Sequence, residues 1–114
     1  MQYKLVYLAS PYTHPDAKVR EERFKAAQDA ATRLLKKGVF AFSPIAYNHP
    51  MHLDFNLPTD WNFWKPYDIA FLERCSEVLV LQLDGWDQSV GVAAEVEFAR
   101  ETGIPVNYTK LEEL

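Results

Sequence analysis

The chain has 114 residues, 48% of them hydrophobic, which is enough for one buried core but too few for two domains. Its net charge of −4 disfavours binding to a nucleic-acid polymer, since a phosphate backbone is held by clustered Lys and Arg. A free nucleotide stays compatible, because backbone N–H groups can hold a small anion. Cys75 is the single cysteine, so no internal disulfide is expected and a reducing, cytoplasmic location is favoured. No long apolar run or signal pattern predicts a membrane span or secretion.

The first half of the chain predicts a strand, a helix, a second strand and a long loop. An apolar strand over residues 3–9 ends at Ser10-Pro11. A helix follows from Asp16 to Lys37, with an apolar stripe on one face and Gly38 as its stop. A short strand is expected over 39–42. Residues 43–58 contain three prolines and little periodicity, which predicts a loop that serves as a lid or pocket wall.

The second half predicts two more helices and two more strands. Thr59 is the expected N-cap of a helix that is broken or kinked at Pro66 and continues to residue 75. A strand over 77–83 leads through a turn into a helix that ends at Gly103, and a last strand covers 104–108. The alternation of strands and helices predicts one α/β domain over residues 1–114. We expect a doubly wound, Rossmann- or flavodoxin-like parallel sheet in the order 2-1-3-4, with helices on both faces.

One segment places a hydroxyl, a glycine and a carboxylate around a strand-to-helix turn. It reads Ser89-x-Gly91-x-x-x-Glu95 and lies at the carboxyl end of the third predicted strand. Small ligands bind at this edge of open α/β sheets, where helix N-termini converge. Two simpler interpretations stay open: Ser89 can be an ordinary N-cap, and Glu95 can lie on a solvated helix face beside Glu97.

Three parts of the chain together resemble the nucleoside 2-deoxyribosyltransferase superfamily, which includes the deoxynucleoside 5'-monophosphate N-glycosidases. They are Tyr7-Leu8-Ala9-Ser10-Pro11-Tyr12, Asp68 before an amphipathic helix, and the Ser89-to-Glu95 motif. With Trp61 and the Asp84-Gly85-Trp86 turn, the chain is most similar to an uncharacterised phage and bacterial branch. The resemblance implies an enzyme that needs no cofactor and acts on a small nucleoside or nucleotide.

The resemblance also implies roles for individual residues. Glu95 matches the carboxylate that attacks the anomeric carbon, and Asp68 matches an acidic residue that contacts the sugar or protonates the leaving base. Tyr7 matches an aromatic residue beside the sugar or nucleophile, although a strand tyrosine can also simply pack in the core. Asp68 can likewise be an exposed helical acid near Arg74. Ser89 matches the serine of the monophosphate hydrolases, which favours a nucleotide held by Ser89, Gly91 and Ser10.

The tryptophan, histidine and cysteine side chains are weaker candidates for the site. Trp86 and Trp61 are the aromatic side chains we expect in the pocket, where they would stack on a base. His49 and His52 lack further ligands at a fixed spacing, so no metal site is predicted. Cys75 is expected to be a buried apolar residue rather than a nucleophile.

Two rival functions are compatible with the same pattern. One is a non-catalytic module that binds a nucleotide or an ADP-ribose-type signal, in which Glu95 only holds the ribose. The other is a subunit-interaction protein without a small ligand. The resemblance also implies a homo-oligomer, a dimer or larger, whose site is completed by a neighbouring subunit, and the aromatic side chains of residues 47–64 exceed what a small core needs.

Overall fold

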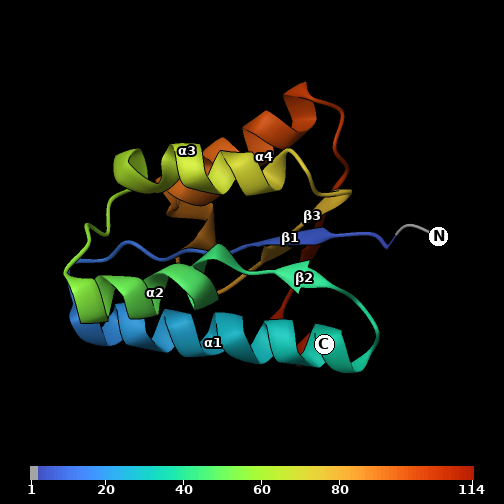
Figure 1. The fold of residues 1–114 in the computed structure, drawn as a ribbon. Helices are drawn as coiled ribbons and strands as arrows, with labels where there is room; N and C mark the ends of the chain where they lie inside the picture. Colours follow the sequence, from blue (N-terminus) through green and yellow to red (C-terminus); the bar gives the residue numbers. More distant parts are fainter. Residues whose placement is uncertain (1–2) are drawn as a thin grey trace.

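Four short parallel strands form one sheet that lies between two layers of helices in the computed structural model, which describes residues 3–114 (Figure 1). The strands are β1 (Val6–Ala9), β2 (Ala41–Phe42), β3 (Glu77–Leu81) and β4 (Val106–Thr109). They are arranged in the order β2-β1-β3-β4, and all three pairings are parallel. The predicted fold class and strand order are therefore confirmed. The strands are shorter than predicted, because β1 begins only at Val6 and β3 ends at Leu81.

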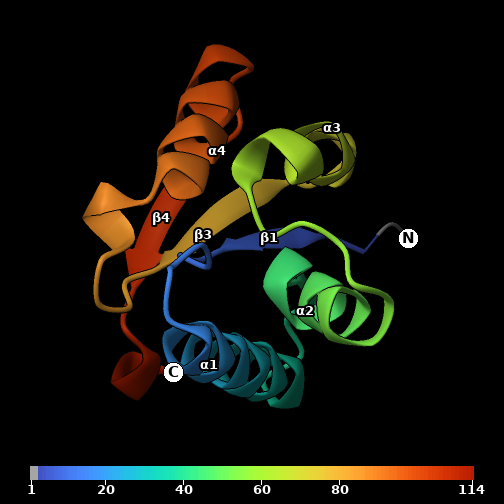
Figure 2. The same ribbon diagram turned by 90° about the vertical axis from the view of Figure 1, so that its left-hand side faces the viewer.

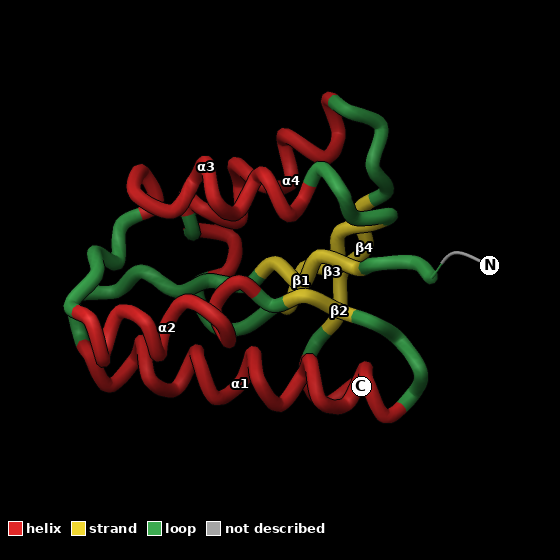
Figure 3. Tube along the Cα trace, in the orientation of Figure 1, coloured by secondary structure: helices red, strands yellow, loops and turns green. Residues whose placement is uncertain are grey.

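The helices cover both faces of the sheet. Helices α1 (Ala17–Lys36) and α2 (Pro44–Phe55) lie on one side, and α3 (Trp61–Leu72) and α4 (Val90–Glu101) lie on the other (Figure 2). Two short 3-10 helices, η1 (Trp86–Gln88) and η2 (Leu111–Glu113), follow β3 and β4. Figure 3 shows the strands side by side between these helical layers. Strands flanked by helices on both faces match the Rossmann-like architecture.

Alternating side chains of the central strand β1 build the two halves of the core. Tyr7 and Ala9 pack with residues of α3 and α4 on one face. Leu8 packs against α1 on the other face, together with Ala30 and Leu34. All four residues of β1 are buried. Ser10 follows the last of them, so it lies at the carboxyl edge of the sheet, where it is buried too. The fold thus brings the end of β1 and the start of α4 to the same edge.

The segment 43–58, predicted as a loop, instead forms helix α2. Pro44 occupies the first turn, where a missing N–H costs no hydrogen bond, and the Ser43 side chain caps the helix by accepting from the Ala46 N–H at 3.1 Å. Pro50 lies inside the helix without ending it, and Asn56 in the left-handed conformation ends it. The helical spacing is present, but two of the side chains that follow it are polar: Asn48 and His49 share the buried face with Ile45.

Of the break or kink predicted at Pro66, the break does not occur, since α3 is one helix from Trp61 to Leu72. Its N-cap is Asp60 and not Thr59, because the Asp60 carboxylate accepts from the Phe63 N–H at 3.2 Å. Packing against the core offsets the one backbone hydrogen bond that Pro66 removes. No helix of the described part of the chain is long and apolar enough to cross a membrane.

Candidate active site

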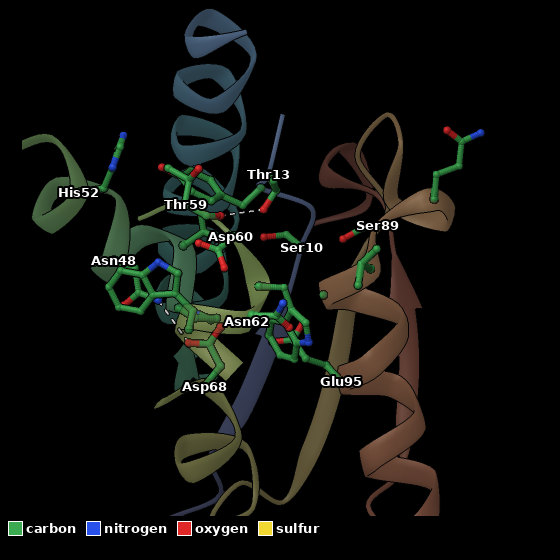
Figure 4. A pocket seen from close by; sticks show the side chains of 18 residues that line it. Ser10, Thr13, Asn48, His52, Thr59, Asp60, Asn62, Asp68, Ser89 and Glu95 are labelled. Atoms are coloured by element: carbon green, nitrogen blue, oxygen red, sulfur yellow. Dashed lines mark hydrogen bonds between the residues drawn. The ribbon is translucent and has the colours of Figure 1, made fainter. Parts of the chain in front are cut away.

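A cavity of about 370 Å³ opens at the carboxyl edge of the sheet, within the size range of small-molecule sites. Its walls come from the loop after β1, from α2, from the start of α3 and from the start of α4 (Figure 4). The labelled side chains of Figure 4 that line it are Ser10, Thr13, Asn48, His52, Thr59, Asp60, Asn62, Asp68, Ser89 and Glu95. Segments from the first loop, from the middle of the chain and from α4 therefore meet around one cavity.

Glu95 lies in this cavity and is only 4% exposed. It shares the inward face of α4 with Val92 and Ala99, both of which belong to the core. The interpretation of Glu95 as a solvated surface residue is therefore wrong, whereas the neighbouring Glu97 is exposed. Burial raises the pKa of Glu95 to about 8, and the negative charge of Asp68 adds to that rise while the Tyr7 hydrogen bond opposes it.

The hydroxyl of Tyr7 donates a hydrogen bond to Glu95 Oε2. Tyr7 is fully buried in the middle of β1, so the sheet holds its ring and leaves the hydroxyl directed at the carboxylate. Burial, followed by the charge of Glu95, raises the pKa of Tyr7 well above its usual range. Tyr7 thus remains a hydrogen-bond donor, and its hydrogen bond favours the ionised form of Glu95.

Asp68 is the second buried carboxyl group of the cavity. It projects from α3, is 4% exposed, and accepts a hydrogen bond from Asn48 Nδ2 at 3.2 Å. Burial raises the pKa of Asp68 to about 7, and the Asn48 hydrogen bond lowers it in part. Its interpretation as an exposed helical acid is wrong. Two carboxyl groups with shifted pKa values in one cleft are typical of acid–base sites.

Polar groups at the start of α4 and the end of β1 form another part of the wall. Ser89 caps α4 by accepting from the Val92 N–H at 3.2 Å, and its own hydroxyl proton stays available for a ligand. The Ser10 hydroxyl is buried and has no hydrogen-bond partner among the described residues. Gly91 also lines the cavity. Hydroxyl groups and the positive end of a helix are groups that can hold an anion.

Of the two tryptophans expected in the pocket, Trp61 lies there and Trp86 does not, whereas Trp64, which was not singled out, also lines the cavity. Trp61 lines the cavity and packs on Gly91, where an added Cβ would lie 3.2 Å from its ring atom Cε3. Trp64 lines it too, with Nε1 donating to the Pro58 carbonyl at 2.8 Å. Trp86 does not belong to the cavity wall. The left-handed Gly85 turns the chain into η1, and Trp86 packs against the core and Tyr108 instead.

Sequence reasoning expected residues 43–58 in the pocket wall but missed that they form helix α2 and which side chains this helix buries. His49 is 2% exposed, and its two ring nitrogens lie 2.5 Å from the Tyr12 hydroxyl and 2.6 Å from Glu21 Oε2. Asn48, the preceding residue, reaches the cavity and Asp68. The spacing of Ile45, Asn48, His49 and His52 could have revealed this face if polar residues had been counted as buried.

Two other predictions concern metals and Cys75. No group of three or more His, Cys, Asp or Glu side chains suited to a metal ion occurs among residues 3–114. Cys75 is buried in the core cluster beside α3 and α4, and burial raises the pKa of its thiol. A protonated buried thiol is a poor nucleophile, in line with the apolar role predicted for it.

Comparisons with known proteins place this geometry in context. The chain is similar to a solved 2-deoxyribosyltransferase from the psychrotolerant bacterium Bacillus psychrosaccharolyticus, at 25% identity and a TM-score of 0.65, over 93% of this chain and 72% of that one. No curated protein sequence matches significantly. A family model described as a domain of unknown function, DUF1937, matches residues 4–110. Since this match spans the sheet, both helical layers and every wall of the cavity, the chain belongs to the DUF1937 family.

Proposed function

We propose that this protein is an enzyme that breaks the N-glycosidic bond of a nucleoside or nucleotide and passes the sugar to water or to a second base. The observation that carries the proposal is the burial of Glu95 in the same cavity as Asp68, with the Tyr7 hydroxyl on the Glu95 carboxylate. The similarity to a 2-deoxyribosyltransferase supports the same reaction class. The oxocarbenium-like transition state of such a reaction is positive at the anomeric carbon, which a nearby carboxylate stabilises.

In the proposed first step, a Glu95 oxygen forms a bond to the anomeric carbon while the bond from that carbon to the base breaks. The bonding electron pair leaves with the base, and Asp68 supplies the proton that the base takes up. The Tyr7 hydroxyl holds the attacking carboxylate in one orientation. The sugar is then an ester of Glu95.

In the second step, water or another base attacks the anomeric carbon and releases Glu95. The incoming group loses a proton, which the Asp68 carboxylate accepts, so both carboxyl groups return to their starting states. The pKa of about 7 for Asp68 suits this exchange of a proton near neutral pH.

We also propose that the preferred substrate carries a 5'-monophosphate. Ser89, the start of α4 and the Ser10 hydroxyl, which has no hydrogen-bond partner in residues 3–114, all line the cavity and offer donors to an anion. If so, the loss of kcat/KM in Ser89→Ala should be about ten times larger for the monophosphate than for the nucleoside. This factor corresponds to one charge-assisted hydrogen bond.

The test is to incubate the purified protein with 2'-deoxynucleosides, ribonucleosides and their 5'-monophosphates, and to measure free base by chromatography. We expect base release, reduced by at least about 10³-fold in Glu95→Gln, because the amide cannot form the ester. Glu97→Gln is the matched control, an exposed carboxylate on the same helix, and should keep full activity.

A different result would favour the non-catalytic binding module. If calorimetry detects tight binding of an intact nucleotide but no base is released, then Glu95 serves only to hold the sugar. If the protein neither binds nor cleaves any compound of the panel, the proposed function is contradicted altogether.

A further inference from the structure

Asn48 carries a buried acceptor atom without a partner on the wall of the cavity. Its Nδ2 donates to Asp68 Oδ1 at 3.2 Å, whereas its Oδ1 has no hydrogen-bond partner among the described residues. The residue is 4% exposed and lines the cavity, where Figure 4 shows it facing Asp68. A buried amide oxygen without a partner is unfavourable by about 1–3 kcal/mol, so a ligand N–H that reaches it would bind strongly.

The hydrogen bond from Asn48 also distinguishes the two oxygens of Asp68. Oδ1 accepts from Nδ2, so the proton of the neutral acid belongs on the other oxygen, Oδ2. The pair therefore presents an acceptor, Asn48 Oδ1, beside a donor, the Asp68 Oδ2 hydroxyl. A ligand that satisfies both must offer an N–H donor next to an atom that takes up a proton.

We propose that Asn48 is a specificity-determining residue that makes the enzyme prefer a 6-aminopurine over a 6-oxopurine as the leaving base. This inference rests on the proposed function and extends it to the identity of the base. In a 6-aminopurine the amino group is adjacent to N7, so the amino N–H donates to Asn48 Oδ1 while N7 accepts the proton of Asp68. A 6-oxopurine places a carbonyl oxygen opposite Asn48 Oδ1, and two acceptors then face each other.

The bond changes balance at this edge of the base. The bond between N9 and the anomeric carbon breaks, its electron pair stays on the purine, and N7 gains the proton of Asp68 Oδ2. Asp68 becomes a carboxylate, Glu95 becomes the sugar ester, and a neutral aminopurine leaves. The acceptor of the hydrogen bond from Asn48 Nδ2 is then a charged carboxylate, so this hydrogen bond becomes stronger as the base departs.

The experiment compares kcat/KM for 2'-deoxyadenosine and 2'-deoxyinosine, each as nucleoside and as 5'-monophosphate. We expect the adenine substrate to be favoured by about 10- to 100-fold, the value of one buried hydrogen bond exchanged for an acceptor pair. Asn48→Leu should reduce this ratio to within about threefold of unity, because the isosteric side chain neither accepts nor repels.

Asn62→Leu is the matched control: Asn62 lines the same cavity but is exposed, so its replacement should leave the ratio of the two substrates unchanged. Purine 2'-deoxyriboside, which has only hydrogen at position 6, tests the wild-type protein directly. Its kcat/KM should fall between those of the other two substrates, and this measurement holds even if Asn48→Leu does not fold.

Equal rates for the two substrates, a preference for the oxopurine, or an unchanged ratio in Asn48→Leu would overturn the inference while leaving the proposed function in place. Absence of base release from every substrate would overturn the proposed function itself, and the two failures are thereby distinguished.

Discussion

The pKa values of Glu95 and Asp68 are both raised, because both carboxyl groups are removed from water. Burial raises the pKa of Glu95 to about 8 and that of Asp68 to about 7. The proposed reaction needs Glu95 ionised and Asp68 protonated, which is the less populated of the two singly protonated forms because Glu95 has the higher pKa. Below about pH 7 both groups hold their protons and the nucleophile is lost, while above about pH 8 both are ionised and the acid is lost.

A bell-shaped dependence of kcat/KM on pH is therefore expected, with its maximum between about 7 and 8. Asp68→Asn should lower kcat/KM by about 10²- to 10⁴-fold and abolish the fall at high pH, since no acid is left to lose its proton. The rise at low pH should shift to lower pH, because the charge of Asp68 contributes to the raised pKa of Glu95. Initial rates across pH 5 to 10 measure all three effects.

Asp60→Asn is the control for this profile, because Asp60 lies in the same cavity but is exposed, and asparagine caps a helix as well as aspartate does. It should keep the bell shape. A profile of Asp68→Asn that still falls at high pH would contradict the role of Asp68 as the acid.

At the scale of elements, helix α2 positions Asn48 against Asp68. Hydrogen bonds of His49 with Tyr12 and Glu21 hold α2 in place. A carboxylate can only accept, so His49 donates from Nε2 to Glu21 on α1 and accepts at Nδ1 from the Tyr12 hydroxyl. The ring also packs on Phe24 of α1, with centroids 4.7 Å apart. Three segments are thereby joined behind the cavity wall.

His49→Leu should lower the free energy of unfolding by about 2–4 kcal/mol, because the buried Tyr12 hydroxyl loses its partner and the packing against Phe24 changes. Urea titration followed by circular dichroism measures it. Glu22→Gln, at an exposed position on α1, should change stability by less than about 0.5 kcal/mol. Equal stability of His49→Leu and the wild type would show that the network does not hold α2 in place.

At the scale of the whole molecule, an aromatic surface extends over α2 and α3. Tyr47 is 55% exposed, Phe63 45% and Phe55 76%. Phe71, itself 39% exposed, stacks on Phe42 with centroids 4.3 Å apart and planes inclined by 9°. Exposed apolar patches of this kind mark interaction surfaces, and these two helices also supply walls of the cavity.

The homo-oligomer expected from the sequence is therefore predicted to form through α2 and α3. Light scattering coupled to gel filtration should give a mass of at least two chains at micromolar concentration. Phe63→Ser should weaken the association, whereas Leu35→Ser, a 60% exposed site on α1, should not. A monomer at every concentration, or equal effects of the two substitutions, would contradict this surface as the interface.

The sequence by itself determined the order of the four strands and of helices α1, α3 and α4, the parallel sheet and the position of Glu95 at its carboxyl edge. Apolar periodicity and glycine stops are local signals, and the crossover rules then leave few topologies. The same local signals failed at residues 43–58, because the buried face of α2 is partly polar and Pro44 begins the helix rather than preventing it. Helix propensity and apolar spacing do not reveal that a histidine is buried when its hydrogen-bond partners come from other elements.

Only the tertiary structure decided the contacts that the side chains around the cavity make. The Tyr7 hydroxyl on Glu95, the Asn48 amide on Asp68 and the displacement of Trp86 to the core join residues from separate elements. Such contacts depend on the angles at which helices pack on the sheet, and no spacing along the chain encodes them. The raised pKa values follow for the same reason, since burial is a property of the assembled fold.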